Sequence, residues 1–267
     1  MTKNSMTNTI YTLDTISKQQ FTRLINPSDT LLEIGPYAAP AFSKKTHNVF
    51  YADILTPDEI RKDCANHGYN PNNAPEKIDF LIDIKSLPFI KTEMKFDAVY
   101  SSHNIEHQPD LIRHLNEMFD ITTDSGKMFL AIPDKRYCFD HFQNETTIND
   151  VIAAHLEKRT KPSTSSILKE ILFLTHNYSD RHWRGESGPN PYTDLSEEEV
   201  LLRLRDALLK VDENKDGYVD LHSWQFTPVS FAKQISLLNQ MKYHHWTLSH
   251  VWHTKVNSNE FYAVLTK

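Results

Sequence analysis

The sequence predicts an α/β protein organised around a mostly parallel sheet. Across residues 20–135, short apolar runs alternate with segments of helical periodicity, an order that builds parallel sheets. Two of these runs end near acidic residues, Glu33 in the first and Asp53 after the second. Ligands of open α/β sheets bind outside the carboxyl ends of the strands. We therefore expect both acids to face one binding crevice at that edge.

The elements before residue 57 contribute the first part of this crevice. Residues 1–20 predict a polar arm that leads into a helix around residues 21–25. Residues 31–34 and 49–52 predict the first two strands, with a turn through Gly35 after the first. The turn lacks the further glycines that bring a backbone close to a pyrophosphate, so a nicotinamide or flavin dinucleotide is not expected.

The next elements continue the alternation of strand and helix. Residues 57–77 predict a short helix followed by a loop, because the segment is polar and rich in proline. Residues 79–84, 96–101 and 128–132 predict the third, fourth and fifth strands. Apolar residues recur at helical spacing over residues 111–119, between the last two of these strands. The sheet is therefore expected to hold at least these strands in parallel.

Composition excludes several classes of protein. A chain of 267 residues that is 39% hydrophobic can bury a sizeable core as one domain with additions. The net charge of −6 predicts no general affinity for nucleic acid. Cys64 and Cys138 share no metal-type spacing, which fits idle thiols in a reducing cytoplasm. No apolar run approaches the length of a membrane span, and the polar N-terminus predicts no signal peptide.

The motifs after the strands resemble those of a known superfamily. The sequence reads Glu33-Ile-Gly35 at the first strand, Asp53 after the second, Asp83-Ile-Lys-Ser-Leu-Pro-Phe after the third, and Ser101 to Glu106-His107 after the fourth. Over roughly residues 20–135 this order resembles class I S-adenosylmethionine-dependent methyltransferases. Residues 132–142 and 220–231 look like a branch of that superfamily often encoded among bacterial genes for surface-polysaccharide and capsule assembly.

This resemblance implies a fold and an organisation. The fold would be a Rossmann-like, seven-stranded, mostly parallel sheet whose last two strands, at 246–256 and 260–266, form an antiparallel hairpin. A single methyltransferase domain would consist of an N-terminal arm (1–20), a cofactor-binding core (21–135), a helical acceptor-specificity insertion (136–222) and a C-terminal helix and hairpin (223–267). Within the insertion, residues 151–156 and 167–174 read as helices.

The resemblance also implies the cofactor S-adenosylmethionine and a site for it. Glu33 would lie at the methionine end, and Asp53 would take both ribose hydroxyls, since one carboxylate can accept two hydrogen bonds. Asp83 would face the adenine amino group. The expected cofactor-binding residues are Glu33, Gly35, Pro36, Asp53, Asp83, Ile84, Ser101 and Ser102.

The turn from His103 to His107 is open to several interpretations. The His-x-x-Glu-His spacing is a zinc motif in one group of metalloproteases, but Pro109 follows too soon for the long helix that motif occupies. Some class I methyltransferases that act on hydroxyls hold a divalent metal near this corner, which leaves His103, Glu106 and His107 as an alternative ligand set. We expect no metal, and Glu106 and His107 to shape the site wall or His107 to act as a base.

A general base is expected among a small set of residues. His107 is the first choice, because the end of the fourth strand would lie beside the departing methyl group. The candidates are His107, His103, Asp134, His141 and His222. Asp140 and His141 read as an acid–imidazole pair, but neighbours in a strand face opposite ways.

One further motif resembles a metal site. Residues 212–220 match the first nine positions of an EF-hand loop, but Ser223 replaces the bidentate glutamate at the twelfth. We expect a tight Asp-Gly turn there and no calcium.

The function expected from the resemblance is methyl transfer from S-adenosylmethionine to a hydroxyl of a carbohydrate, a polysaccharide precursor or another small-molecule acceptor. Two rivals remain open. One is a metal-dependent hydrolase built on His103, Glu106 and His107. The other is a non-catalytic protein that binds S-adenosylmethionine.

Overall fold

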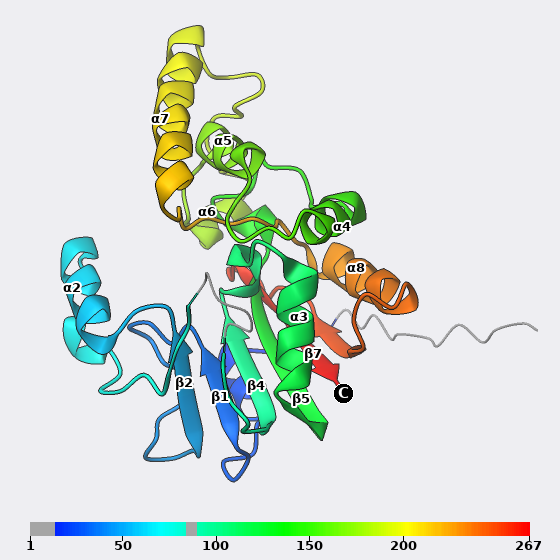
Figure 1. Ribbon diagram of the computed structural model, residues 1–267. Helices are drawn as coiled ribbons and strands as arrows, with labels where there is room; N and C mark the ends of the chain where they lie inside the picture. The colour runs from blue at the N-terminus through cyan, green and yellow to red at the C-terminus, as the bar shows by residue number, and fades with distance from the viewer. Residues whose placement is uncertain (1–13, 84–89) are drawn as a thin grey trace, which may run out of the picture.

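A computed structural model describes residues 14–83 and 90–267 and contains a seven-stranded sheet in the order β3-β2-β1-β4-β5-β7-β6 (Figure 1). The strands are β1 (Leu31–Ile34), β2 (Val49–Asp53), β3 (Phe80–Leu81), β4 (Phe96–Ser102), β5 (Thr122–Pro133), β6 (Thr247–Trp252) and β7 (Glu260–Thr266). The strands from β1 to β5 pair in parallel, and β7 runs antiparallel to both β5 and β6. The expected Rossmann-like sheet with a C-terminal hairpin is confirmed.

The helices surround this sheet and extend beyond one end of it. The α-helices are α1 (Lys18–Thr22), α2 (Pro57–His67), α3 (Leu111–Asp120), α4 (Ile148–Leu156), α5 (Thr164–Phe173), α6 (Ser179–Trp183), α7 (Glu197–Asp216) and α8 (Pro228–Gln240). Short 3-10 helices follow as η1 (Pro71–Asn73), η2 (Ile105–His107) and η3 (Lys135–Tyr137). The helices expected at 111–119, 151–156 and 167–174 are therefore present.

The pairing register of β1 with β2 and β4 brings the carboxyl ends of these three strands level with one another. In β1, Glu33 pairs with Tyr51 of β2 and Tyr100 of β4. Ile34, the next residue of β1, likewise lies between Ala52 and Ser101. The residues that follow the three strands therefore emerge side by side at one edge of the sheet.

Alternating side chains divide the core between the two faces of the sheet. Leu32 and Val99 belong to the larger apolar cluster, which includes buried residues of α3 and α8. Leu31 and Tyr100 belong to the opposite cluster, which Phe21 of α1 joins. Strands buried on both faces explain why these runs are continuously apolar in the sequence.

The segment between β5 and α8 forms a helical insertion at one end of the sheet, in which α4 packs against α3 and α5 packs against α7 (Figure 1). The Asp-Gly turn expected from residues 212–220 proved to be the end of a helix, because α7 continues to Asp216 before Gly217. A capping box between Ser196 and Glu199 starts α7, and the run behind it is rich in strong helix formers.

The third strand is shorter than expected. It covers Phe80–Leu81 where the sequence predicted 79–84, and residue 84 lies outside the described residues. Within the described chain, none of the helices combines the length and apolar character that crossing a bilayer requires.

Candidate functional site

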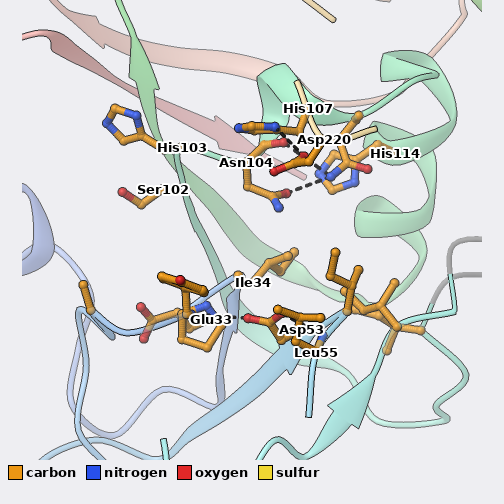
Figure 2. Close-up of a pocket in the computed structure, with 18 of the residues that line it drawn as sticks. Glu33, Ile34, Asp53, Leu55, Ser102, His103, Asn104, His107, His114 and Asp220 are labelled. Carbon is orange, nitrogen blue, oxygen red and sulfur yellow. Dashed lines mark hydrogen bonds and ion pairs between the residues drawn. The ribbon is translucent and has the colours of Figure 1, made fainter. Parts of the chain in front are cut away.

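A cavity of about 650 Å³ opens at the carboxyl ends of the parallel strands. Figure 2 shows Glu33 and Asp53, from the ends of β1 and β2, on one side of it. His103, Asn104 and His107 lie on the opposite side, after β4. The insertion contributes Thr160, and the segment after α7 contributes Tyr218 and Asp220. The cavity is therefore enclosed between the sheet edge and the insertion.

Gly35 turns the chain at the floor of this cavity. Its φ of +65° lies in the left-handed region, which favours glycine. A Cβ atom at Gly35 would lie 3.3 Å from Nδ2 of Asn104, so the turn and the segment after β4 approach closely here. Tyr37 also has a positive φ, of 43°. The backbone therefore curls back toward β2 without a second glycine.

Glu33 holds this turn in place from inside the protein. Its buried carboxylate accepts hydrogen bonds from the backbone N–H groups of Ala41 (2.6 Å) and Phe42 (3.2 Å). Burial raises the pKa of Glu33 to about 7, against the lowering effect of these two hydrogen bonds. Glu33 therefore both shapes the turn and lines the cavity.

Asp53 joins the same turn to the end of β2. The backbone N–H of Leu55 donates to its carboxylate at 3.0 Å and that of Tyr37 at 3.3 Å. Burial raises the pKa of Asp53, opposed by these hydrogen bonds. A carboxylate offers about four acceptor positions. About two of them are thus left for hydroxyl groups of a ligand.

A network of charged and polar side chains forms the wall of the cavity beyond β4. Nε2 of His103 lies 3.0 Å from Oε2 of Glu260, at the start of β7. Nζ of Lys18 donates to Oγ of Ser102 at 3.2 Å and lies 3.7 Å from the same carboxylate. Burial favours the neutral acid, but the hydrogen bond to His103 and the charge of Lys18 together lower the pKa of Glu260 to about 2. His103 is therefore oriented by an ionised carboxylate.

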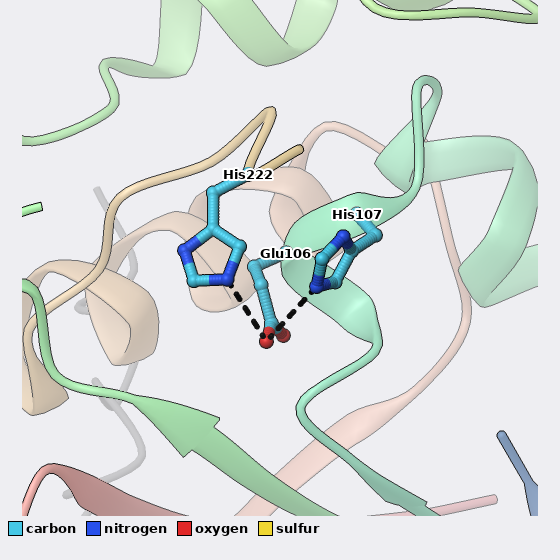
Figure 3. Close-up of side chains that lie close together, drawn as sticks. All are labelled: Glu106, His107 and His222. Atoms are coloured by element: carbon cyan, nitrogen blue, oxygen red, sulfur yellow. Dashed lines mark ion pairs between the residues drawn. The ribbon is translucent and has the colours of Figure 1, made fainter. Parts of the chain in front are cut away.

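A cluster of buried Glu106, half-buried His107 and buried His222 adjoins the cavity (Figure 3). Oε1 of Glu106 lies 3.8 Å from Nε2 of His107 and 3.7 Å from Nε2 of His222. The other ring nitrogen of each histidine faces an acid, Asp220 at 2.9 Å from His107 and Asp140 at 2.6 Å from His222. Burial lowers and Asp140 raises the pKa of His222, which stands at about 9.

Most residues expected from the sequence meet at the cavity. The expected residues that line it are Glu33, Gly35, Pro36, Asp53, Ser102, His103 and His107. Ser101 is buried outside the described lining, and Asp83 is exposed outside it. Ile84 lies outside the described residues, so its expected role stays a prediction.

The remaining candidates for a general base lie away from the described lining of the cavity. Asp134 is buried in an ion pair with Arg136 (2.6 Å) and accepts a hydrogen bond from Thr254 (2.5 Å). Nδ1 of His141 lies 2.6 Å from the carbonyl oxygen of Arg136. His222 lies behind His107, their ring centroids 4.7 Å apart.

Sequence reasoning missed several residues at the site and gave Asp140 a role only beside His141. The missed residues are Lys18, Tyr37, Asn104, Asp220 and Glu260. A signal existed for Glu260, because an antiparallel strand beside parallel ones begins at the edge where the others end. An acid at the start of the last strand thus reaches the same crevice. No local spacing announces Asp140, whose partner is distant in sequence.

The fold and the cavity together define a Rossmann-like α/β protein with a ligand pocket at the carboxyl edge of its sheet. No family model and no curated protein matches the chain.

Solved structures are similar in fold. One, from Rhodobacter sphaeroides and described as a Zn-dependent alcohol dehydrogenase, is 16% identical, with 95% of this chain and 90% of that chain covered and a TM-score of 0.49. An S-adenosylmethionine-dependent methyltransferase from Mesorhizobium loti is 12% identical, with 92% and 95% covered and a TM-score of 0.46. The plantazolicin methyltransferase BpumL, solved with SAH, is 12% identical, with 93% and 79% covered and a TM-score of 0.43. With TM-scores below 0.5, these likenesses carry no conclusion about function.

Proposed function

We propose that this protein is an S-adenosylmethionine-dependent methyltransferase. The observation that carries the proposal is the meeting of Glu33, Gly35 and Asp53 at one cavity of about 650 Å³. These are the residues that the resemblance to class I methyltransferases singles out. The volume lies within the range of pockets that enclose small ligands and cofactors.

The residues of the pocket fit this cofactor. Gly35 lets the backbone approach a ligand, since its Cα carries no side chain to fill the floor of the cavity. Asp53 would accept the two ribose hydroxyls at its remaining acceptor positions. Glu33 and Lys18 line the same cavity and match the ammonium and carboxylate groups of the methionine end. Asp83, with Ile84 beside it, stays our proposal for the adenine end.

When bound, the cofactor supplies an electrophilic methyl carbon. The chain itself has to align an acceptor, exclude water and take up one proton. His103 and His107 line the cavity, and each has an acid on one ring nitrogen, Glu260 and Asp220 respectively. Nδ1 of His103 and Nε2 of His107 are the atoms that would receive the proton. His107 is the base favoured by its position at the end of β4.

We further propose a hydroxyl-bearing acceptor, a carbohydrate or polysaccharide precursor, and a cytoplasmic setting. The acceptor class is supported by the resemblance of residues 132–142 and 220–231 to the polysaccharide-associated branch. The setting is supported by Cys64 and Cys138, which are buried free thiols.

Calorimetry with S-adenosylmethionine and its demethylated product tests the cofactor. We expect saturable binding of both ligands, and mass spectrometry of nucleotide sugars incubated with enzyme and cofactor should show a gain of one methyl group. Absence of binding by the folded chain would overturn the proposal. Binding without a methylated product from any acceptor would instead make the protein a non-catalytic binder.

A further inference from the structure

We propose that Glu106, His107 and His222 bind one divalent transition-metal ion beside the cofactor pocket. Their ligand atoms, one carboxylate oxygen and two imidazole nitrogens, all lie within 4.8 Å of one another (Figure 3). This ligand set differs from the one that the sequence spacing offered, because His222 takes the place of His103. The inference rests on the geometry of these side chains and goes beyond the proposed methyl transfer.

The first argument is the condition of the Glu106 carboxylate. Its side chain is 0% exposed, and neither oxygen has a hydrogen-bond partner among the described residues. Burying a carboxylate with no bonded partner is costly, so buried carboxylates are paired or coordinate metals. Nε2 of His222 (3.7 Å), Nε2 of His107 (3.8 Å) and Nδ1 of His103 (3.9 Å) lie within ion-pair range of Oε1 of Glu106, but all three are too far to donate a hydrogen bond.

These separations suit a shared ion. Metal–ligand bonds of about 2.0–2.2 Å in tetrahedral geometry set neighbouring ligand atoms roughly 3.4 Å apart. The observed distances from Glu106 to His107 and His222 differ from this value by a few tenths of an ångström. All three ligand atoms lie within 4.8 Å of one another, so an ion between them would satisfy the carboxylate once the side chains had closed in on it.

The second argument comes from the groups behind the two histidines. Asp220 lies 2.9 Å from Nδ1 of His107, and Asp140 lies 2.6 Å from Nδ1 of His222. A metal ion that binds Nε2 displaces any proton from that nitrogen, and a carboxylate on Nδ1 keeps the other proton there, so that the lone pair of Nε2 is directed at the cluster. Histidine ligands of metal ions almost always carry such a partner on the second nitrogen. Here both histidines do.

The backbone also holds the two halves of the cluster together. The carbonyl oxygen of Glu106 accepts hydrogen bonds from the N–H groups of Ser223 (2.7 Å) and Trp224 (3.2 Å). The indole of Trp224 donates to the carbonyl oxygen of Gln108 at 2.6 Å. The segment that carries His222 is thus fastened to η2, which carries Glu106 and His107, so the ligand set is preorganised.

The donor set selects the kind of metal. Two imidazoles and one carboxylate suit Zn²⁺, Fe²⁺ or Mn²⁺, whereas Mg²⁺ and Ca²⁺ prefer oxygen ligands alone. Three protein ligands leave coordination positions open, and His107 borders the cavity. If the proposed function holds, the ion would bind the acceptor hydroxyl there and lower its pKa. His107 would then be a ligand, and the proton would pass to His103.

Metal uptake by the tag-free full-length chain tests the site. The protein is stripped with a chelator, titrated separately with Zn²⁺, Mn²⁺ and Co²⁺, desalted and analysed for bound metal. We expect one tightly held ion per chain, and visible absorption bands with Co²⁺. Glu106→Gln and His222→Gln should each weaken binding by more than about 100-fold, because a ligand contributes more than the outer partners, which are worth about 10–100-fold.

Two matched variants give the test its specificity. His245→Gln removes an exposed histidine of the same chain. His103→Gln removes the histidine whose Nε2 is held by Glu260 and whose Nδ1 lies 3.9 Å from Glu106, outside the proposed ligand set. Both should keep the metal. Loss of metal from His103→Gln together with retention in His222→Gln would overturn the ligand set, and so would full retention in Glu106→Gln.

The metal test and the methyltransferase proposal can fail independently of each other. Calorimetry with the demethylated cofactor reports both the fold and the cofactor pocket of each variant without requiring activity. A stripped protein that binds this ligand but takes up no metal at micromolar concentration overturns the metal site alone. A protein that binds metal but not the ligand overturns the methyltransferase proposal alone.

Discussion

Asp140 and His222 are 82 positions apart in the chain, yet Oδ2 of Asp140 lies 2.6 Å from Nδ1 of His222. Both side chains are buried. The backbone N–H of His222 also donates to Glu170 of α5 at 2.8 Å. The loop after β5, the insertion and the segment before α8 therefore converge on one imidazole, whose Nε2 is left facing Glu106.

Replacing Asp140 by Asn tests this orientation. The amide retains a hydrogen-bonding group of the same shape but removes the charge that fixes the Nδ1 proton of His222. We expect the affinity for metal to fall by about 10–100-fold while the chain stays folded. Metal titration of the variant measures the change. Unchanged affinity would mean that Asp140 only supports packing around His222.

Replacing Asp53 by Ala should weaken binding of S-adenosylmethionine by about 1–3 kcal/mol, because two ribose hydroxyls lose their acceptor in a partly buried site. Calorimetry measures the affinity. Asp58→Ala, at an exposed acid in the first turn of α2, is the matched control and should bind normally. Equal affinities for the two variants would remove Asp53 from the cofactor site.

The part of the site that sequence reasoning located is the part built from strand ends. Parallel strands end at one edge, so Glu33, Asp53 and the turn after β4 had to meet once the strands were recognised. The strands themselves could be recognised because they are buried on both faces, which makes each of them a mostly apolar run in the sequence.

The rest of the site depends on contacts that no local pattern specifies. Asp140 was considered with its neighbour His141, but the fold pairs it with His222. Helix α7 was missed because the acidic run at 212–216 resembles a loop motif, whereas helix propensity carries the chain through it. Glu260 reaches the site only because β7 reverses direction against β5.

Two glycines allow a paired test of the turn after β1. Gly35 and Gly68 both have left-handed φ values, +65° and +76°, but only the Cβ position at Gly35 is crowded, by Asn104 at 3.3 Å. Alanine at either position should lower the free energy of unfolding by about 1–2 kcal/mol, the cost of a side chain in that conformation. Only Gly35→Ala should also weaken cofactor binding. A loss of affinity in Gly68→Ala would point to a general effect of destabilisation.

Glu33 should make stability fall as the pH rises. Its folded-state pKa of about 7 lies above the ordinary value of 4.5, so the folded chain keeps a proton that the unfolded chain has lost. The contribution of Glu33 to the stability of the folded chain is fully present below pH 4.5 and is lost as the pH rises through about 7. The free energy of unfolding changes by about 3 kcal/mol at most over this range. Urea unfolding at pH 5 and pH 8 should show Glu33→Gln gaining stability relative to the wild type at the higher pH.

Glu260 is the control for this prediction, because its pKa is shifted in the opposite direction to that of Glu33. Its folded-state pKa of about 2 lies below 4.5, so its contribution is present above 4.5 and disappears only as the pH falls through about 2. Glu260→Gln should therefore lower the stability at both pH 5 and pH 8, without the gain at the higher pH that is expected of Glu33→Gln. A Glu33→Gln effect that is independent of pH would contradict the raised pKa of Glu33.

The final prediction separates the two imidazoles at the end of β4. If His107 is a metal ligand, the proposed base is His103 in place of His107; Glu260 holds Nε2 of His103, and its Nδ1 lies 3.9 Å from Oε1 of Glu106. His103→Gln should lower kcat by about 10²–10⁴-fold, with cofactor affinity and bound metal unchanged. Part of the loss should return at high pH, where the acceptor hydroxyl ionises without the help of a base.

The matched variant is His107→Gln, which should lower kcat and lose the metal together. Turnover with acceptor, metal content and cofactor affinity are measured on both proteins. If His103→Gln turns over normally while His107→Gln is inactive with its metal retained, His107 is the base, as its place after the fourth strand predicted. The assignment of His103 would then be wrong, because an imidazole that only supports Glu260 can be replaced without loss of the proton acceptor.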